Sequence, residues 1–278
     1  MKIGVRAHDF GRQDVDSLAE NIKKAGFGCV QLAPTKAIEG VGGFDDITED
    51  CLEDICIAFM LDTNVEITVL GCYIEPSVPD KETRLKNVEI FKANLTNARR
   101  LRIQIVGTET TNFNDIASHS PEREKAYQLL KDSVLRMVEH AEKAGVIVGI
   151  EPVAEHTLNT PKLTRRLLDE VGSDKLKVIF DPVNLVLPDT IHKQDEIFRE
   201  FFELVGKDIV VVHIKDTVIE NNQKTWRNIR KGVINYPLIF NWLIKHKPDI
   251  RILREGVQMD SYKEDILAMT DLMEGRFL

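Results

Sequence analysis

The stretch VVHIKDT, Val211 to Thr217, is a short apolar run that ends in a histidine, a lysine and an aspartate. An apolar run with ionisable groups at its C-terminal end is typical of a strand in a parallel α/β barrel, where those ends form the active-site face. Three other runs, VIVGIEP, LKVIFDP and IRILREG, end in the same manner with Glu151, Asp181 and Glu255. On successive strands of a barrel, these three side chains and that of His213 would converge on one point.

The rest of the chain alternates short β-rich runs with longer amphipathic segments, a pattern that predicts βα units and a parallel sheet. The expected strands are KIGVRAH, FGCVQLA, NVEITVLGCY, RIQIVGTET, VIVGIE, KVIFD, IVVVHI and IRILRE. The expected helices cover residues 14–25, 48–61, 81–101, 121–144, 160–171, 194–206, 236–246 and 260–273. Eight units of similar length favour closure over an open sheet, so the predicted fold class is α/β, a (β/α)8 TIM barrel.

Length and composition agree with one soluble globular domain. The 278 residues suffice for one barrel of about 250 residues, although two smaller domains would fit by length alone. We expect a single domain over residues 1–278. The net charge of −8 argues against broad binding to nucleic acid or an anionic membrane. There is no secretory signal and no long apolar run, so we expect a cytoplasmic protein with neither partner.

Two other kinds of site receive little support. The four cysteines have no CxxC spacing, and they are most simply small buried hydrophobic residues. The glycine-rich piece GVGGF, which starts at Gly40, opens no evident helix, so it does not predict a dinucleotide site.

The four strand-end residues suit a metal ion. Carboxylate oxygens with one imidazole are ligands for Mn²⁺, Mg²⁺ or Co²⁺, and for Zn²⁺ as well, while the lack of thiolates argues against a purely structural zinc. Singly, an acidic residue at a strand end caps a helix or forms an ion pair, and a lone buried histidine is usually a core residue. Crowding four such groups together carries a desolvation cost, which favours one shared divalent cation. Mn²⁺ is the first candidate.

The strand-end pattern IEP, FDPVN, HIKD and REG resembles the xylose isomerase-like TIM-barrel superfamily, in particular its sugar-phosphate isomerase/epimerase branch. The likeness covers nearly the whole chain. It implies one divalent cation held by Glu151, Asp181, His213 and Glu255. In the ketose 3-epimerases of this superfamily the two glutamates also act as acid and base, and these roles fall here on Glu151 and Glu255.

The function that this resemblance implies is a metal-dependent isomerase or epimerase of carbohydrate metabolism, acting on a sugar or a sugar phosphate. Chelation of a substrate carbonyl and its neighbouring hydroxyl would stabilise an enediolate. One glutamate removes a proton, and the other returns a proton to the opposite face, or a shuttle returns it to the adjacent carbon. The order of the two glutamates stays open.

Six further residues are candidates for substrate contact, and most have another interpretation. Two histidines also suit core, capping or surface roles, and a carboxylate after the fourth strand also suits a hydrated loop. A lysine beside His213 could pair with a metal-bound carboxylate instead of the substrate. The candidates are His8, Glu109, His156, Asn184, Lys215 and Arg227.

The segment ENNQKTWRNIRKG after the seventh strand could bind a phosphate or carboxylate and stack on a sugar. It contains three cations and a tryptophan, Trp226, although such a charge cluster is more often simply hydrated. Many relatives carry a more glycine-rich and acidic turn where this chain reads IRKG. The substrate therefore stays open.

Three other functions compete. Apurinic endonucleases of the superfamily hold three zinc ions with extra histidines, but Asn184 stands where they have one, and GCY and GTE end the third and fourth strands without histidine. An inosose-type keto-polyol dehydratase or lyase would use the same enediolate to expel a hydroxyl. A non-catalytic sugar- or partner-binding barrel is the third, although both glutamates are intact. The oligomeric state also stays open, with a homodimer and a homotetramer as candidates.

Overall fold

The computed structural model describes residues 1–113 and 122–277. Its eight parallel strands form a closed barrel in the order β1-β10-β7-β6-β5-β4-β3-β2, which confirms the predicted (β/α)8 fold class. The extent of the single domain, residues 1–278, stays a prediction. The barrel strands are β1 (Lys2–Arg6), β2 (Cys29–Leu32), β3 (Glu66–Gly71), β4 (Ile105–Glu109), β5 (Ile147–Glu151), β6 (Leu176–Phe180), β7 (Ile209–Ile214) and β10 (Arg251–Arg254).

By its internal contacts the chain falls into two compact units. The first contains Met1–Thr68, Pro188–Asp195 and Val211–Leu278, and the second contains Val69–Leu187 and Glu196–Val210.

In the first unit, β1 pairs in parallel with both β10 and β2. Strand β10 pairs with β7, with Leu253 opposite His213, and the Glu255 backbone N–H continues the ladder to the Ile214 carbonyl. This register brings the residue after β10 level with the end of β7. The helices of this unit include α1 (Val15–Lys24), α2 (Pro34–Ala37), α3 (Glu49–Ile55), α9 (Tyr236–His246) and α10 (Tyr262–Met273).

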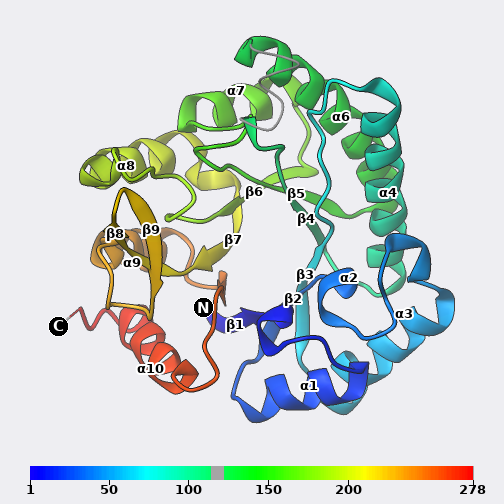
Figure 1. The fold of residues 1–278 in the computed structure, drawn as a ribbon, viewed down its shortest axis with the longest axis horizontal. Coiled ribbons are helices and arrows are strands. Elements are labelled where there is room, and N and C mark those ends of the chain that lie inside the picture. The colour runs from blue at the N-terminus through cyan, green and yellow to red at the C-terminus, as the bar shows by residue number, and fades with distance from the viewer. Residues whose placement is uncertain (114–121, 278) are drawn as a thin grey trace. The chain divides into compact units, whose positions relative to one another are not determined.

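In the second unit, β4 pairs with β5 along its whole length, and β5 pairs with β6. Gly107 and Gly149 are required there, because a Cβ at these positions would come within 2.9 Å of the side chains of Ile179 and Ile105, respectively. The missing side chains leave room for the isoleucines between the strands. Helices α4 (Lys81–Arg100) and α6 (Arg123–Ala144) lie side by side (Figure 1), and α7 (Pro161–Val171) and α8 (Gln194–Val205) complete this unit.

Most helix boundaries match the sequence prediction because local capping sets them. The side chains of Asp14, Thr48 and Thr160 accept hydrogen bonds from the first turns of α1, α3 and α7. The helix expected to begin at Pro121 is described from Arg123, since Pro121 lies outside the described residues. Residues Cys56–Asp62, expected to continue the α-helix, form a wider π-helical turn. Among the described residues, no helix has both the length and the apolar character needed to cross a membrane.

The segment after β7 differs from the prediction of an irregular loop. It forms an antiparallel hairpin of β8 (Asp216–Glu220) and β9 (Gln223–Arg227), visible in orange in Figure 1. Asn221 and Asn222 form the two-residue turn with φ values of 50° and 60°. Asparagine tolerates this left-handed conformation, and such turns match the twist of a hairpin.

The base of this hairpin is anchored by one carboxylate. Asp216 is buried and accepts backbone N–H bonds from Thr217, Arg230, Gly232 and Ile234, at 2.9 to 3.3 Å. Burial raises the pKa of Asp216, although these hydrogen bonds act in the opposite direction. The carboxylate therefore fixes both the beginning of the hairpin and the segment that follows it.

Candidate metal centre

His213 is held at the end of β7 by a neighbour that the sequence analysis did not select. Its ring is almost fully buried, with 1% of its surface exposed, and its Nε2 lies 2.8 Å from Oε1 of Gln31 on β2. An amide oxygen can only accept a hydrogen bond, so Nε2 is the donor. The other ring nitrogen, Nδ1, lies 3.0 Å from Oε1 of Glu255.

Glu255 follows β10 directly and is surrounded by positive charge. Its Oε2 lies 2.8 Å from Nζ of Lys215 and 3.5 Å from Nη1 of Arg6. Burial alone would raise the pKa of this carboxyl, but Lys215, His213 and Arg6 hold the pKa well below its usual range. Glu255 is therefore a carboxylate at neutral pH. The predicted pairing of Lys215 with a carboxylate of the site is present.

Asp9 connects the end of β1 to the segment after Glu255. Its Oδ1 accepts bonds from Nε and Nη2 of Arg6, at 3.0 and 2.7 Å. Its Oδ2 accepts the backbone N–H groups of Gly256 and Val257, at 2.7 and 3.2 Å. These bonds position both Arg6 and the backbone next to Glu255, so Asp9 and Arg6 are two further residues that the sequence analysis missed.

Glu151 and Asp181 lie at the ends of β5 and β6, and both are buried. Oδ1 of Asp181 accepts the backbone N–H groups of Val183 and Asn184, at 2.9 and 3.2 Å. The turn that this makes presents the amide of Asn184 to Glu151, and Nδ2 donates to Oε1 over 2.6 Å. Asp181 thus orients Asn184, and Asn184 orients Glu151.

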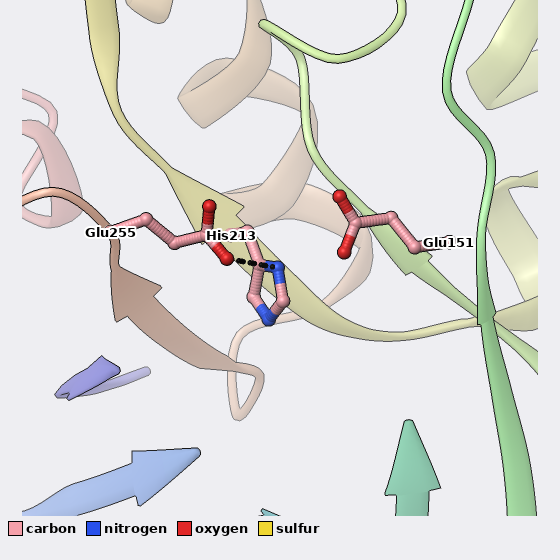
Figure 2. A group of neighbouring side chains, drawn as sticks. All are labelled: Glu151, His213 and Glu255. Atoms are coloured by element: carbon pink, nitrogen blue, oxygen red, sulfur yellow. Dashed lines mark ion pairs between the residues drawn. The ribbon is translucent and has the colours of Figure 1, made fainter. Parts of the chain in front are cut away.

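Three of the four predicted ligands come together. Glu151, His213 and Glu255 each offer one ligand atom, and these atoms all lie within 4.8 Å of one another (Figure 2). All three residues are buried, and two carboxylates with an imidazole form a donor set that suits a divalent metal. The residues present therefore fit such an ion. Asp181, which is not part of this group of three, stays a prediction as the fourth ligand.

The other predicted substrate residues occupy different environments. His8 lies in a 3-10 turn after β1, and burial, with the charges of Arg6 and Lys36, lowers its pKa to about 3, so the ring is neutral at pH 7. Glu109 at the end of β4 is partly exposed, and its Oε2 lies 3.9 Å from Nδ1 of His156. Their contacts with a substrate stay predictions.

The cations of the hairpin segment are engaged with acidic residues. Arg227 donates from Nη2 to Glu220 across the hairpin, at 2.6 Å, and Arg230 lies 3.5 Å from Asp271. Trp226 has a different position, since Nζ of Lys215 lies 5.2 Å from the centre of its ring. The tryptophan is therefore next to the lysine that contacts Glu255. A role of Arg227 in substrate binding stays a prediction.

A family model described as xylose isomerase-like TIM barrel matches residues 19–271. The chain belongs to the xylose isomerase-like TIM barrel family. No curated protein matches its sequence. This family membership agrees with the resemblance in the strand-end pattern.

Solved structures share the fold of this family member at low sequence identity. A D-tagatose 3-epimerase-like protein superimposes with a TM-score of 0.79 and 18% identity, covering 99% of this chain and 98% of that one. The 3-keto-D-glucoside 4-epimerase YcjR from E. coli gives 0.75 and 17%, with 99% of each chain covered. The IOLI protein with a bound zinc atom gives 0.72 and 15%, covering 99% and 96%.

Proposed function

We propose that this protein is a divalent-metal-dependent isomerase or epimerase of a small carbohydrate, acting through an enediolate with Glu151 and Glu255 as the acid–base pair. The observation that carries the proposal is the convergence of two buried glutamates and a histidine within 4.8 Å. Two epimerases or epimerase-like proteins among the structures of the same fold support it.

The residues that would hold the cation are Glu151, His213 and Glu255, with Asp181 as the fourth. When bound, the cation supplies a positive charge that polarises the substrate carbonyl and offsets the negative charge developing beside it. We propose Mn²⁺ as the ion, with Mg²⁺, Co²⁺ and Zn²⁺ as alternatives. A zinc atom is bound in the IOLI structure of the same fold.

The two glutamates move the protons. Lys215 and Arg6 keep Glu255 as a carboxylate, which is the form that accepts a proton. The bond from Asn184 leaves Glu151 with a defined orientation. Return of a proton to the opposite face of the same carbon gives an epimer, and return to the adjacent carbon gives an aldose–ketose isomer.

We also propose that the protein is cytoplasmic, that residues 1–278 form one domain, and that its partner is a small-molecule carbohydrate and neither nucleic acid nor a membrane. His8, Glu109, His156, Asn184, Lys215 and Arg227 are the proposed substrate contacts. The ion pairs of the hairpin arginines favour an uncharged sugar over a phosphorylated one, because Glu220 and Asp271 already offset these positive charges.

The test is proton exchange with solvent. Ketoses, aldoses, their phosphates and inososes are incubated with the protein and Mn²⁺ in D₂O and followed by NMR. We expect deuterium at carbon with at least one sugar, and the labelled position separates an epimerase from an isomerase. Loss of water from an inosose would favour the dehydratase, and a complete lack of exchange, with or without added Mn²⁺, Mg²⁺, Co²⁺ or Zn²⁺, would favour a binding protein.

Substitution links the exchange to the site. Glu255→Gln and Glu151→Gln should each abolish exchange and keep the fold, since glutamine has nearly the same shape but cannot carry the proton. Glu203→Gln, at an exposed position of α8, is the matched control and should exchange at the normal rate. Normal exchange in Glu255→Gln would contradict the acid–base role.

A further inference from the structure

We propose that Gln31 is a positioning residue of the metal centre, which keeps a proton on Nε2 of His213 and thereby presents Nδ1 as the metal-binding atom. The metal part of this inference rests on the proposed function. The hydrogen bond itself does not, because it is present between protein groups alone.

The direction of this bond follows from the atoms that make it. Oε1 of Gln31 lies 2.8 Å from Nε2 of His213, and an amide oxygen has no proton to give. Nε2 therefore carries the proton in both the neutral and the charged ring. In the neutral ring, the lone pair is then on Nδ1, the nitrogen that lies 3.0 Å from Glu255. The nitrogen facing the other ligand is the one able to coordinate.

The position of Gln31 makes another role unlikely on energetic grounds. Strand β2 reads CVQL, all four residues are buried, and Gln31 is only 3% exposed. Burying an amide without hydrogen bonds costs free energy, and an apolar side chain would fill the same place without that cost. An amide also has no proton to lose in the ordinary pH range, so it accepts the bond from His213 at any pH at which the protein is folded.

Neighbouring strands divide the positioning of two adjacent ligands. Gln31 on β2 lies opposite Arg6 on β1 in the parallel register. Gln31 contacts His213, while Arg6 contacts Glu255, and Asp9 in turn holds Arg6. Partners that hydrogen-bond a metal ligand typically account for about 10- to 100-fold in metal affinity, so the loss of Gln31 should be measurable.

The first experiment examines the ring without any metal. Protein labelled with ¹⁵N-histidine is studied by NMR in the metal-free state, and the His213→Gln variant identifies the His213 signals among the seven histidines. We expect a solvent-protected proton on Nε2 in the unchanged protein and in Gln31→Glu, which keeps an acceptor oxygen. In Gln31→Met, which has a similar shape but no such acceptor, that protection should be lost. A His213 ring with its proton on Nδ1 alone in the unchanged protein would overturn the proposal.

The second experiment measures Mn²⁺ affinity by titration calorimetry on the same folded variants. Gln31→Met should bind about 10- to 100-fold more weakly. Gln31→Glu should bind at least as tightly as the unchanged protein, and Gln223→Met, at an exposed position of β9, should not differ. If Gln31→Met binds Mn²⁺ as tightly as the unchanged protein, the positioning role is overturned and the proposed function stands. If the unchanged protein binds no divalent ion, the proposed function fails, and the role of Gln31 toward a metal fails with it.

Discussion

The side-chain amide of Asn184 donates a 2.6 Å hydrogen bond to Oε1 of Glu151. Asn184 is itself oriented by Asp181, whose carboxylate accepts its backbone N–H. Two residues that the sequence suggested for separate roles, a metal ligand and a substrate contact, thus lie in one chain of hydrogen bonds that ends at a proposed catalytic glutamate.

Replacing Asn184 with alanine should reduce the rate of carbon-bound deuterium exchange while leaving the protein folded. Glu151 loses the donor that orients it, and we expect a loss of about 10- to 100-fold, the range for residues that orient a metal ligand. Exchange is measured by NMR at saturating sugar. Asn241→Ala, at an exposed position of α9, is the control and should keep the normal rate. An unchanged rate in Asn184→Ala would show that the 2.6 Å bond does not matter for turnover.

Arg254 and Asp265 form a buried ion pair whose disruption should be costly. Nε of Arg254 lies 2.7 Å from Oδ2 of Asp265, the two residues are 2% and 0% exposed, and Oδ1 of Asp265 also accepts the Ile229 N–H. Arg254→Met leaves a buried carboxylate without its cation, so the free energy of unfolding should fall by about 3–5 kcal/mol. Urea unfolding measures this loss. The double variant Arg254→Met/Asp265→Asn removes the stranded charge and should recover part of it, and no recovery would argue against a charge effect.

Gly232→Ala should destabilise the protein through contact with Asp216. A Cβ at this position would lie 2.1 Å from Oδ1 of Asp216 and 2.4 Å from the carbonyl oxygen of Thr217. The carboxylate is held by four backbone donors and cannot move cheaply, so we expect a loss of about 1–3 kcal/mol, as for other overpacked sites. Gly42→Ala is the control, since its Cβ would meet nothing closer than 3.6 Å. Equal thermal unfolding temperatures for the two variants would contradict this account.

Arg166 should stabilise the protein in a pH-dependent manner. It pairs with Glu124 and Glu170, and its hydrogen bonds are the main reason that the pKa of each glutamate falls from 4.5 to about 2. A lowered carboxyl pKa contributes stability that is present above pH 4.5 and is lost as the pH falls toward 2. Arg166→Met should therefore be less stable than the unchanged protein at pH 7, and the difference should narrow between pH 4.5 and 2. A constant difference in the urea midpoint across that range would show that the pairing contributes nothing.

Much of the fold could be predicted because its signals are local. The strands are short apolar runs, and side chains such as Asp14 and Thr160 mark the helix starts by capping them. The β8–β9 hairpin was missed because its strands are polar and partly exposed, which removes the hydrophobic pattern. Its one available signal was the pair Asn221–Asn222, whose side chains suit a left-handed turn.

The candidate site divides in the same way. Glu151, His213 and Glu255 could be found because parallel strand ends share one face of a barrel. Gln31 and Asp9 act through hydrogen bonds to residues far away in the sequence, and these depend on which strands become neighbours. The only local indication was the polar Gln31 within the buried run CVQL, a residue type that needs a partner when buried.

The anchoring of the hairpin by Asp216 has a consequence for how relatives of this protein can diverge. All four backbone donors to that carboxylate lie at the base, in Thr217 and in the segment from Arg230 to Ile234, and none lies at the tip. Insertions or exchanges between Glu220 and Gln223 leave these donors in place, and His213 and Lys215 precede the anchor. The hairpin tip is therefore an exchangeable module, through which mutation can alter substrate preference while the chemistry at the strand ends is inherited unchanged.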